Sequence, residues 1–118
     1  MAEATNLLAA NRYGEAEHEL TAVVRLAPDD PDVHILLAKV FEAESKHQEA
    51  VAELQSALKL DDSAEAHITL AHVYLSMNQI EMAQAQGQAV LSLEPGNQQA
   101  LQLMQQIHHQ AGAAGKKP

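Results

Sequence analysis

The sequence predicts an all-α protein built from antiparallel helix pairs, and three observations support that fold class. Similar segments recur along the chain, each carries apolar residues at helical spacing, and turn residues separate them. Apolar residues make up 47% of the 118 positions, mostly as alanine, leucine and valine, and tryptophan is absent. Alanine and leucine favour helices, whereas aromatic and β-branched residues favour strands, so we expect helices throughout.

An alanine marks each copy of the recurring segment. Ala16, Ala50 and Ala83 are separated by 34 and then 33 residues, and a leucine follows each of them at ten residues. A period of this length is typical of a helix pair that buries its apolar face by stacking on the next copy. The sequence therefore predicts a helical solenoid.

The first copy, residues 1–30, is partial. Only the end of its first helix is present, at roughly residues 4–11, and a second helix follows around Ala16. An array that starts in mid-unit indicates either a segment of a longer protein or a chain with a degenerate start.

Two full copies follow at residues 31–63 and 64–97. The stretches 33-VHILLAKVFEA-43 and 66-AHITLAHVYLS-76 carry the apolar stripe of a first helix, and 49-EAVAELQSALK-59 carries that of a second helix. Turn residues separate these helices. The predicted N-caps are Asp30, which precedes a proline, Ser63 and Asn97.

Residues 98–110 have the register of one more first helix, which we expect to cap the last full copy. The stretch 111-AGAAGKKP-118 is typical of a flexible tail. The prediction is thus a single domain over residues 1–110 with about seven helices.

This pattern resembles the tetratricopeptide repeat family, whose unit is a helix-turn-helix of 34 residues. The resemblance covers the chain up to about His109. The matching residues of the two full copies are Ala38, Phe41, Ala50, Leu54 and Ala57, then Ala71, Tyr74, Ala83, Val90 and Pro95.

Three positions depart from the family pattern. His34 and His67 stand where the family usually has tryptophan, Asp62 replaces a proline, and Gly87 replaces a bulky residue inside a helix. A glycine there costs about 0.5–1 kcal/mol relative to alanine. Either a neighbouring helix approaches Gly87 closely or that helix is locally soft, and the sequence leaves both open.

Composition limits the partners and the compartment. The net charge of −9 disfavours nucleic acid and anionic membranes. No basic, apolar leader or membrane-spanning run is present, so we expect a soluble protein. The absence of cysteine fits both cytoplasm and periplasm. The cytoplasm is favoured, and the periplasm would require a longer exported protein.

No set of side chains predicts catalysis. The serines lack nucleophile-elbow glycines, no glycine-rich phosphate loop opens a helix, and the acidic pairs fall at helix starts or solvent faces. His34 and His67 share one repeat position, which favours packing over metal binding. His67 and His72 lie five residues apart, a poor spacing for a shared metal. We therefore predict no enzyme activity, no cofactor and no metal site.

Solenoids of this kind bind ligands on a concave surface formed by their first helices. The family resemblance implies a partner-binding set at Asp32, Ile35, Lys39, Glu42, Glu65, Ile68, His72, Leu75, Gln102 and Gln106. We expect Ile35, Ile68 and Leu75 to be exposed in this groove. Lys39 is the one cation suited to holding a terminal carboxylate, so an acidic tail is disfavoured as ligand.

The leading functional hypothesis is therefore a protein-interaction module, acting as adaptor or scaffold in a larger, bacterial-style assembly. One alternative is a self-associating structural module in which exposed repeat ends stack into dimers or filaments. Another is a substrate-positioning segment of a larger enzyme.

Overall fold

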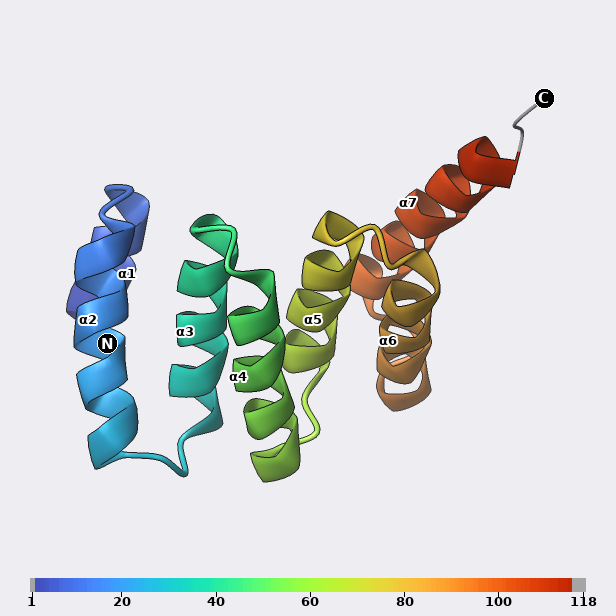
Figure 1. The fold of residues 1–118 in the computed structure, drawn as a ribbon. Coiled ribbons are helices and arrows are strands. Elements are labelled where there is room, and N and C mark those ends of the chain that lie inside the picture. The colour runs from blue at the N-terminus through green and yellow to red at the C-terminus, as the bar shows by residue number, and fades with distance from the viewer. Residues whose placement is uncertain (1, 116–118) are drawn as a thin grey trace. The chain divides into compact units, whose positions relative to one another are not determined.

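The computed structural model describes residues 2–115, with side chains described for residues 4–110. Over that range the chain forms seven α-helices and no strand (Figure 1). They are α1 (Ala2–Ala9), α2 (Tyr13–Leu26), α3 (Pro31–Ala43), α4 (His47–Leu60), α5 (Ala64–Ser76), α6 (Ile80–Leu93) and α7 (Gln98–Gly115). The predicted all-α fold and the predicted helix pairs are confirmed.

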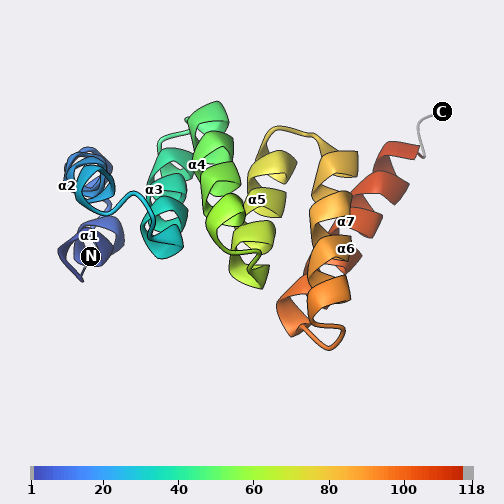
Figure 2. The ribbon, with the colours of Figure 1, turned by 90° about the horizontal axis from the view of Figure 1, so that it is seen from below.

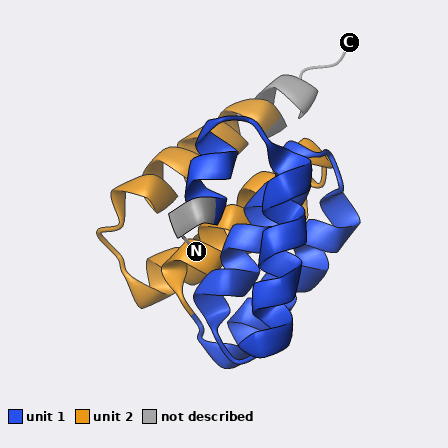
Figure 3. Ribbon diagram, turned by 90° about the vertical axis from the view of Figure 1, so that its left-hand side faces the viewer, with its two compact units in different colours: residues 1–62 blue, residues 63–118 orange. Residues whose placement is uncertain are grey.

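The chain divides into two compact units, residues 1–62 and 63–118, shown in blue and orange in Figure 3. In the first unit α2 packs against α1 and α3, and α3 packs against α4. In the second unit α6 packs against α5 and α7, as Figure 2 shows, and α7 also contacts α5. The boundary at residue 62 falls next to the predicted start of the last full copy at residue 64.

Small residues let the paired helices approach closely. Ala16, Ala50 and Ala83, which mark the repeat, are all fully buried on the second helix of their pairs. In the first unit Leu20 and Leu37 belong to the same core cluster as Ala16. Where a helix has alanine at the contact, the axis of the neighbouring helix can pass close to it. This close approach explains why alanine recurs at this position of each copy.

The helix starts follow the predicted caps. The side chain of Asp30 accepts a hydrogen bond from the backbone amide of Asp32 at 3.0 Å, and Pro31 opens α3. Ser63 accepts from the amide of Ala66 at 3.2 Å. Asn97 accepts from the amide of Ala100 at 2.8 Å. Each cap satisfies a backbone N–H that lacks a partner within the helix.

The turn inside each helix pair contains a residue in the left-handed conformation. Asn11, Ser45 and Asn78 have φ angles of 59°, 62° and 60°. Asparagine tolerates this region because its side chain can hydrogen-bond locally, whereas other L residues with a Cβ are strained there by about 1–2 kcal/mol. Of the three residues, Ser45 is therefore the least suited to the backbone conformation of its turn.

We expect Ser45→Asn to raise the free energy of unfolding by roughly 0.5–1 kcal/mol, because asparagine relieves part of this strain. The reverse change, Asn78→Ser, is expected to cost a similar amount. Urea unfolding measures both changes as shifts of the midpoint at unchanged slope. Equal midpoints for wild type and both variants would contradict the strain argument.

The predicted flexible tail, residues 111–118, is wrong in its first part. Helix α7 continues through 111-AGAAG-115, because alanine has the highest helix propensity and extends a helix that is already nucleated. Residues 116–118 lie outside the described part of the chain. None of the helices in residues 2–115 is both long and apolar enough to span a membrane.

Candidate functional site

A shallow depression on the second unit lies between α5 and α7. Its volume is about 190 Å³. Pockets for small molecules usually enclose about 300–1,000 Å³, so the depression suits one or two side chains of a larger ligand. Two residues of α5 and four of α7 line it: Ile68, His72, Gln99, Gln102, Leu103 and Gln106.

Helical spacing places these side chains on the faces that the two helices turn toward each other. Ile68 and His72 are four residues apart on α5, and the three glutamines of α7 follow each other at three and four residues. Ile68 and Leu103 form an apolar floor, since their exposed fractions are 8% and 2%. His72 and the glutamines are exposed and form the rim.

The rim is polar but carries no Asp, Glu, Lys or Arg. Each glutamine side chain offers a carbonyl acceptor and an amide donor, the same two groups that a peptide bond presents. The arrangement can therefore hydrogen-bond the main chain of a bound segment while an apolar side chain of that segment rests on the floor.

Four of the predicted site residues meet in this depression: Ile68, His72, Gln102 and Gln106. Sequence reasoning missed Leu103. Helical spacing could have identified it, because Leu103 lies four residues after Gln99 and three before Gln106, on the same face of α7.

The other predicted residues do not line the depression. Glu65 is exposed in the first turn of α5, and Leu75 is half-buried near its end. The remaining four, Asp32, Ile35, Lys39 and Glu42, belong to α3 in the first unit.

The exposure predicted for Ile35 and Ile68 is wrong. Ile35 is only 3% exposed and Ile68 only 8%. The expectation assumed one buried stripe for each first helix. However, α3 packs against both α2 and α4, and α5 packs against both α6 and α7. A helix that packs against two neighbours buries a wider part of its surface than a helix with one neighbour. Ile35 and Ile68 fall within this wider buried surface.

His34 and His67 have the packing role that the sequence predicts. The Nδ1 of His34 lies 2.8 Å from Oε1 of Glu53, and its Nε2 lies 2.8 Å from the carbonyl oxygen of Pro28. In the copy that follows, the Nδ1 of His67 lies 2.6 Å from Oε1 of Gln86. Both histidines thus join a first helix to the second helix of the same pair, with partners 19 residues later.

Both ring nitrogens of His34 face acceptors, an arrangement that only the doubly protonated imidazolium satisfies by donating twice. Burial opposes the charge, but the hydrogen bonds to Glu53 and Pro28 and the nearby carboxylates outweigh it. They raise the pKa of His34 above its ordinary value. Among the described residues no three His, Asp or Glu side chains converge in a way that could hold a metal ion.

Comparisons with known proteins agree with this geometry. Two family models, both described as tetratricopeptide repeat, match residues 1–65 and 41–107. No curated protein sequence matches the chain.

Many solved structures share the fold. The Sgt2 TPR domain from Aspergillus fumigatus is 17% identical with a TM-score of 0.89, over 98% of this chain and 79% of that one. The first TPR of Spaghetti (RPAP3), bound to the HSP90 peptide SRMEEVD, is 20% identical with a TM-score of 0.86, over 94% and 89%. The Yersinia enterocolitica type III secretion chaperone SycD, in complex with a peptide of the translocator YopD, is 14% identical with a TM-score of 0.83, over 93% and 90%.

Proposed function

The chain belongs to the tetratricopeptide repeat family, and on that premise we propose that it binds a segment of a partner protein in the depression between α5 and α7. The observation that carries the proposal is the combination of an apolar floor, Ile68 and Leu103, with a polar rim of three glutamines and His72 that contains no Asp, Glu, Lys or Arg. Two similar structures hold peptides, one from HSP90 and one from YopD. The chain would serve as an adaptor or scaffold.

The chemistry of the rim defines the partner segment. Glutamines recognise main-chain amides with little dependence on sequence, and the floor accepts an apolar side chain. A terminal carboxylate would find no lysine or arginine there. With a net charge of −9 the chain also repels acidic segments at a distance. We therefore propose an internal, neutral or basic segment with an apolar anchor.

The acidic peptide SRMEEVD is accordingly expected to bind weakly, with a dissociation constant above about 1 mM. The reason is that no lysine or arginine lines the depression. Fluorescence anisotropy with a labelled peptide gives the affinity. Binding in the micromolar range would contradict the proposed selectivity.

Affinity capture from the native lysate tests the proposed site. The variant Gln102→Arg with Gln106→Arg fills the rim with long cationic side chains, and Gln88→Arg on α6 is the matched control. All three glutamines are exposed, so the changes are expected to leave folding intact. Helical content by circular dichroism verifies this.

Partners captured by the wild type and by Gln88→Arg, but lost with the double variant, would support the proposal. Partners retained by the double variant would overturn it. If the captured protein is an enzyme whose substrate the chain holds, the substrate-positioning alternative is favoured over a general adaptor role. We propose that this interaction takes place in a larger assembly in the cytoplasm.

A further inference from the structure

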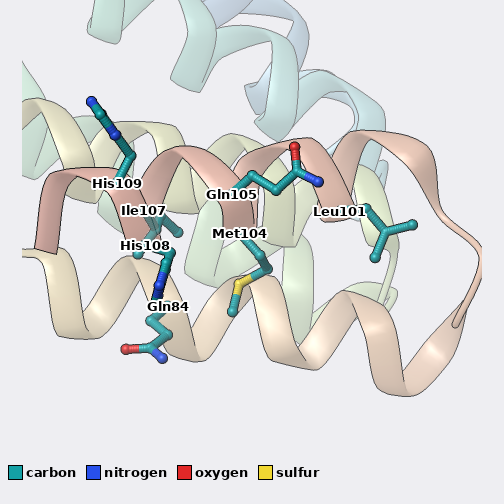
Figure 4. A pocket seen from close by; sticks show the side chains of 7 residues that line it. All are labelled: Gln84, Leu101, Met104, Gln105, Ile107, His108 and His109. Atoms are coloured by element: carbon teal, nitrogen blue, oxygen red, sulfur yellow. The ribbon is translucent and has the colours of Figure 1, made fainter. Parts of the chain in front are cut away.

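Helix α7 has a second face, separate from the depression, where a wider hollow lies along α6 (Figure 4). Its volume is about 520 Å³. Leu101 is 38% exposed there, and Gln105 and His108 are exposed as well. Among the residues that line it are Gln84, Leu101, Met104, Gln105, Ile107 and His108.

The repeat shows that this face is buried in the other first helices. Leu101, Met104, Gln105 and His108 occupy the repeat positions of His34, Leu37, Ala38 and Phe41 on α3. On α3 the first three of these are buried, and His34 contacts Glu53 of α4. On α7 the equivalent Leu101, Gln105 and His108 are exposed in the hollow, whereas Met104 is half-buried beside Gly87 of α6.

The shape of this face does not suit a helix like α4. Where α3 and α5 have the fully buried Ala38 and Ala71, α7 has the long side chain of Gln105. A glutamine keeps a crossing helix at a larger distance than an alanine does. The face is therefore built for a looser helix contact than the one inside a repeat.

The distribution of charge along the chain favours a second copy of the chain as the partner of this face. The stretch 95–115 contains no Asp, Glu, Lys or Arg, whereas each helix from α2 to α6 carries acidic residues. Two copies of a chain with a net charge of −9 repel each other. Contact through α7 brings no like charges into the interface, so this face is where a second copy approaches at the lowest electrostatic cost.

We propose that two copies of the chain associate through this face, with their α7 helices packed antiparallel about a two-fold axis near Met104 and Gln105. Leu101, Gln105 and His108, the exposed residues of this face, are spaced by four and three residues, the seam spacing of paired helices. In this register Leu101 of one copy meets His108 of the other, and Met104 meets Gln105. The two helix dipoles then oppose each other, and the contact closes into a dimer and not a filament.

Sedimentation equilibrium tests the association over roughly 1 µM to 1 mM, the range in which dimers of weak to moderate affinity dissociate. We expect the wild-type mass to rise toward that of a dimer within this range. Gln105→Glu places two carboxylates beside the axis and is expected to raise the dissociation constant about tenfold or more, the equivalent of about 1.4 kcal/mol. Gln105→Lys is expected to act in the same direction.

Mixing the two variants provides the decisive control. Gln105→Glu with Gln105→Lys is expected to associate more tightly than either variant alone, because opposite charges then meet at the axis. Leu26→Glu on α2, at a leucine that is 87% exposed, is expected to leave the association unchanged. A wild type that stays monomeric up to 1 mM, an association that Gln105→Glu leaves unchanged, or a mixture no tighter than its components would each overturn the proposal. The variants leave the depression between α5 and α7 intact, so partner capture reports on the proposed function independently.

Discussion

Replacing Gly87 with leucine is expected to displace α7 from α6 and to lower the free energy of unfolding of the second unit by about 1–3 kcal/mol or more. Gly87 is buried on α6 against α7. A Cβ built there would collide with Sδ of Met104 and would lie 3.3 Å from its Cγ. A leucine requires the Met104 side chain to move, and its further carbon atoms are expected to push α7 away from α6. Urea unfolding gives the loss directly.

A compensating change identifies the cause. In the double variant Gly87→Leu with Met104→Ala, the space that Met104 occupied becomes free, so part of the lost stability is expected to return. Partner capture is expected to fail in Gly87→Leu, because Gln102 and Gln106 move with α7. A Gly87→Leu protein as stable as wild type would contradict the close packing of these helices.

Removing the partner of His34 is expected to have the second large effect. At about pH 6 the change Glu53→Ala leaves a buried imidazolium N–H without its acceptor and is expected to cost roughly 1.5–3 kcal/mol, the range for hydrogen bonds to charged groups. His34 has a folded-state pKa raised above its ordinary value of 6.5. The stability it contributes is fully present below the unfolded pKa and is lost as the pH rises through the folded one. The cost of Glu53→Ala should therefore shrink toward about pH 9.

The equivalent pair in the next copy is the matched control. The partner of His67 is the amide oxygen of Gln86 in place of a carboxylate, so Gln86→Ala removes a hydrogen bond to an uncharged acceptor and is expected to cost roughly 0.5–1.5 kcal/mol. Unfolding in urea at the two pH values measures all four differences. If the cost of Glu53→Ala were the same at both, His34 would not be the charged partner that the geometry indicates.

The fold was predictable because its determinants are local and repeated. The spacing of Ala16, Ala50 and Ala83 gave the helix pairs, and the side chains of Asp30 and Ser63 gave the helix starts. Such signals lie within a few residues of the feature they specify. The end of α7 does not follow from its local composition, because the glycines in 111-AGAAG-115 favour a tail whereas the preceding helix extends through them.

The site was predictable only in part, because burial depends on how many neighbours a helix has. The family resemblance named Ile68, His72, Gln102 and Gln106, and the structure brings these four to one depression. The resemblance could not show that Ile35 and Ile68 are buried, since this follows from packing against two helices each. The sequence left open whether a neighbouring helix approaches Gly87 closely or the helix is locally soft there. The structure shows the close approach, because the side chain of Met104 occupies the space beside Gly87.

The central claim is that a partner segment lies in the depression between α5 and α7. Amide chemical shifts of the ¹⁵N-labelled chain, recorded with the captured partner segment, test it most directly. The account predicts that the largest changes fall on Ile68, His72, Gln102, Leu103 and Gln106, and that Gln102→Arg with Gln106→Arg abolishes them. Changes confined to the other face of α7, around Leu101 and Gln105, or to helices outside this site would contradict it.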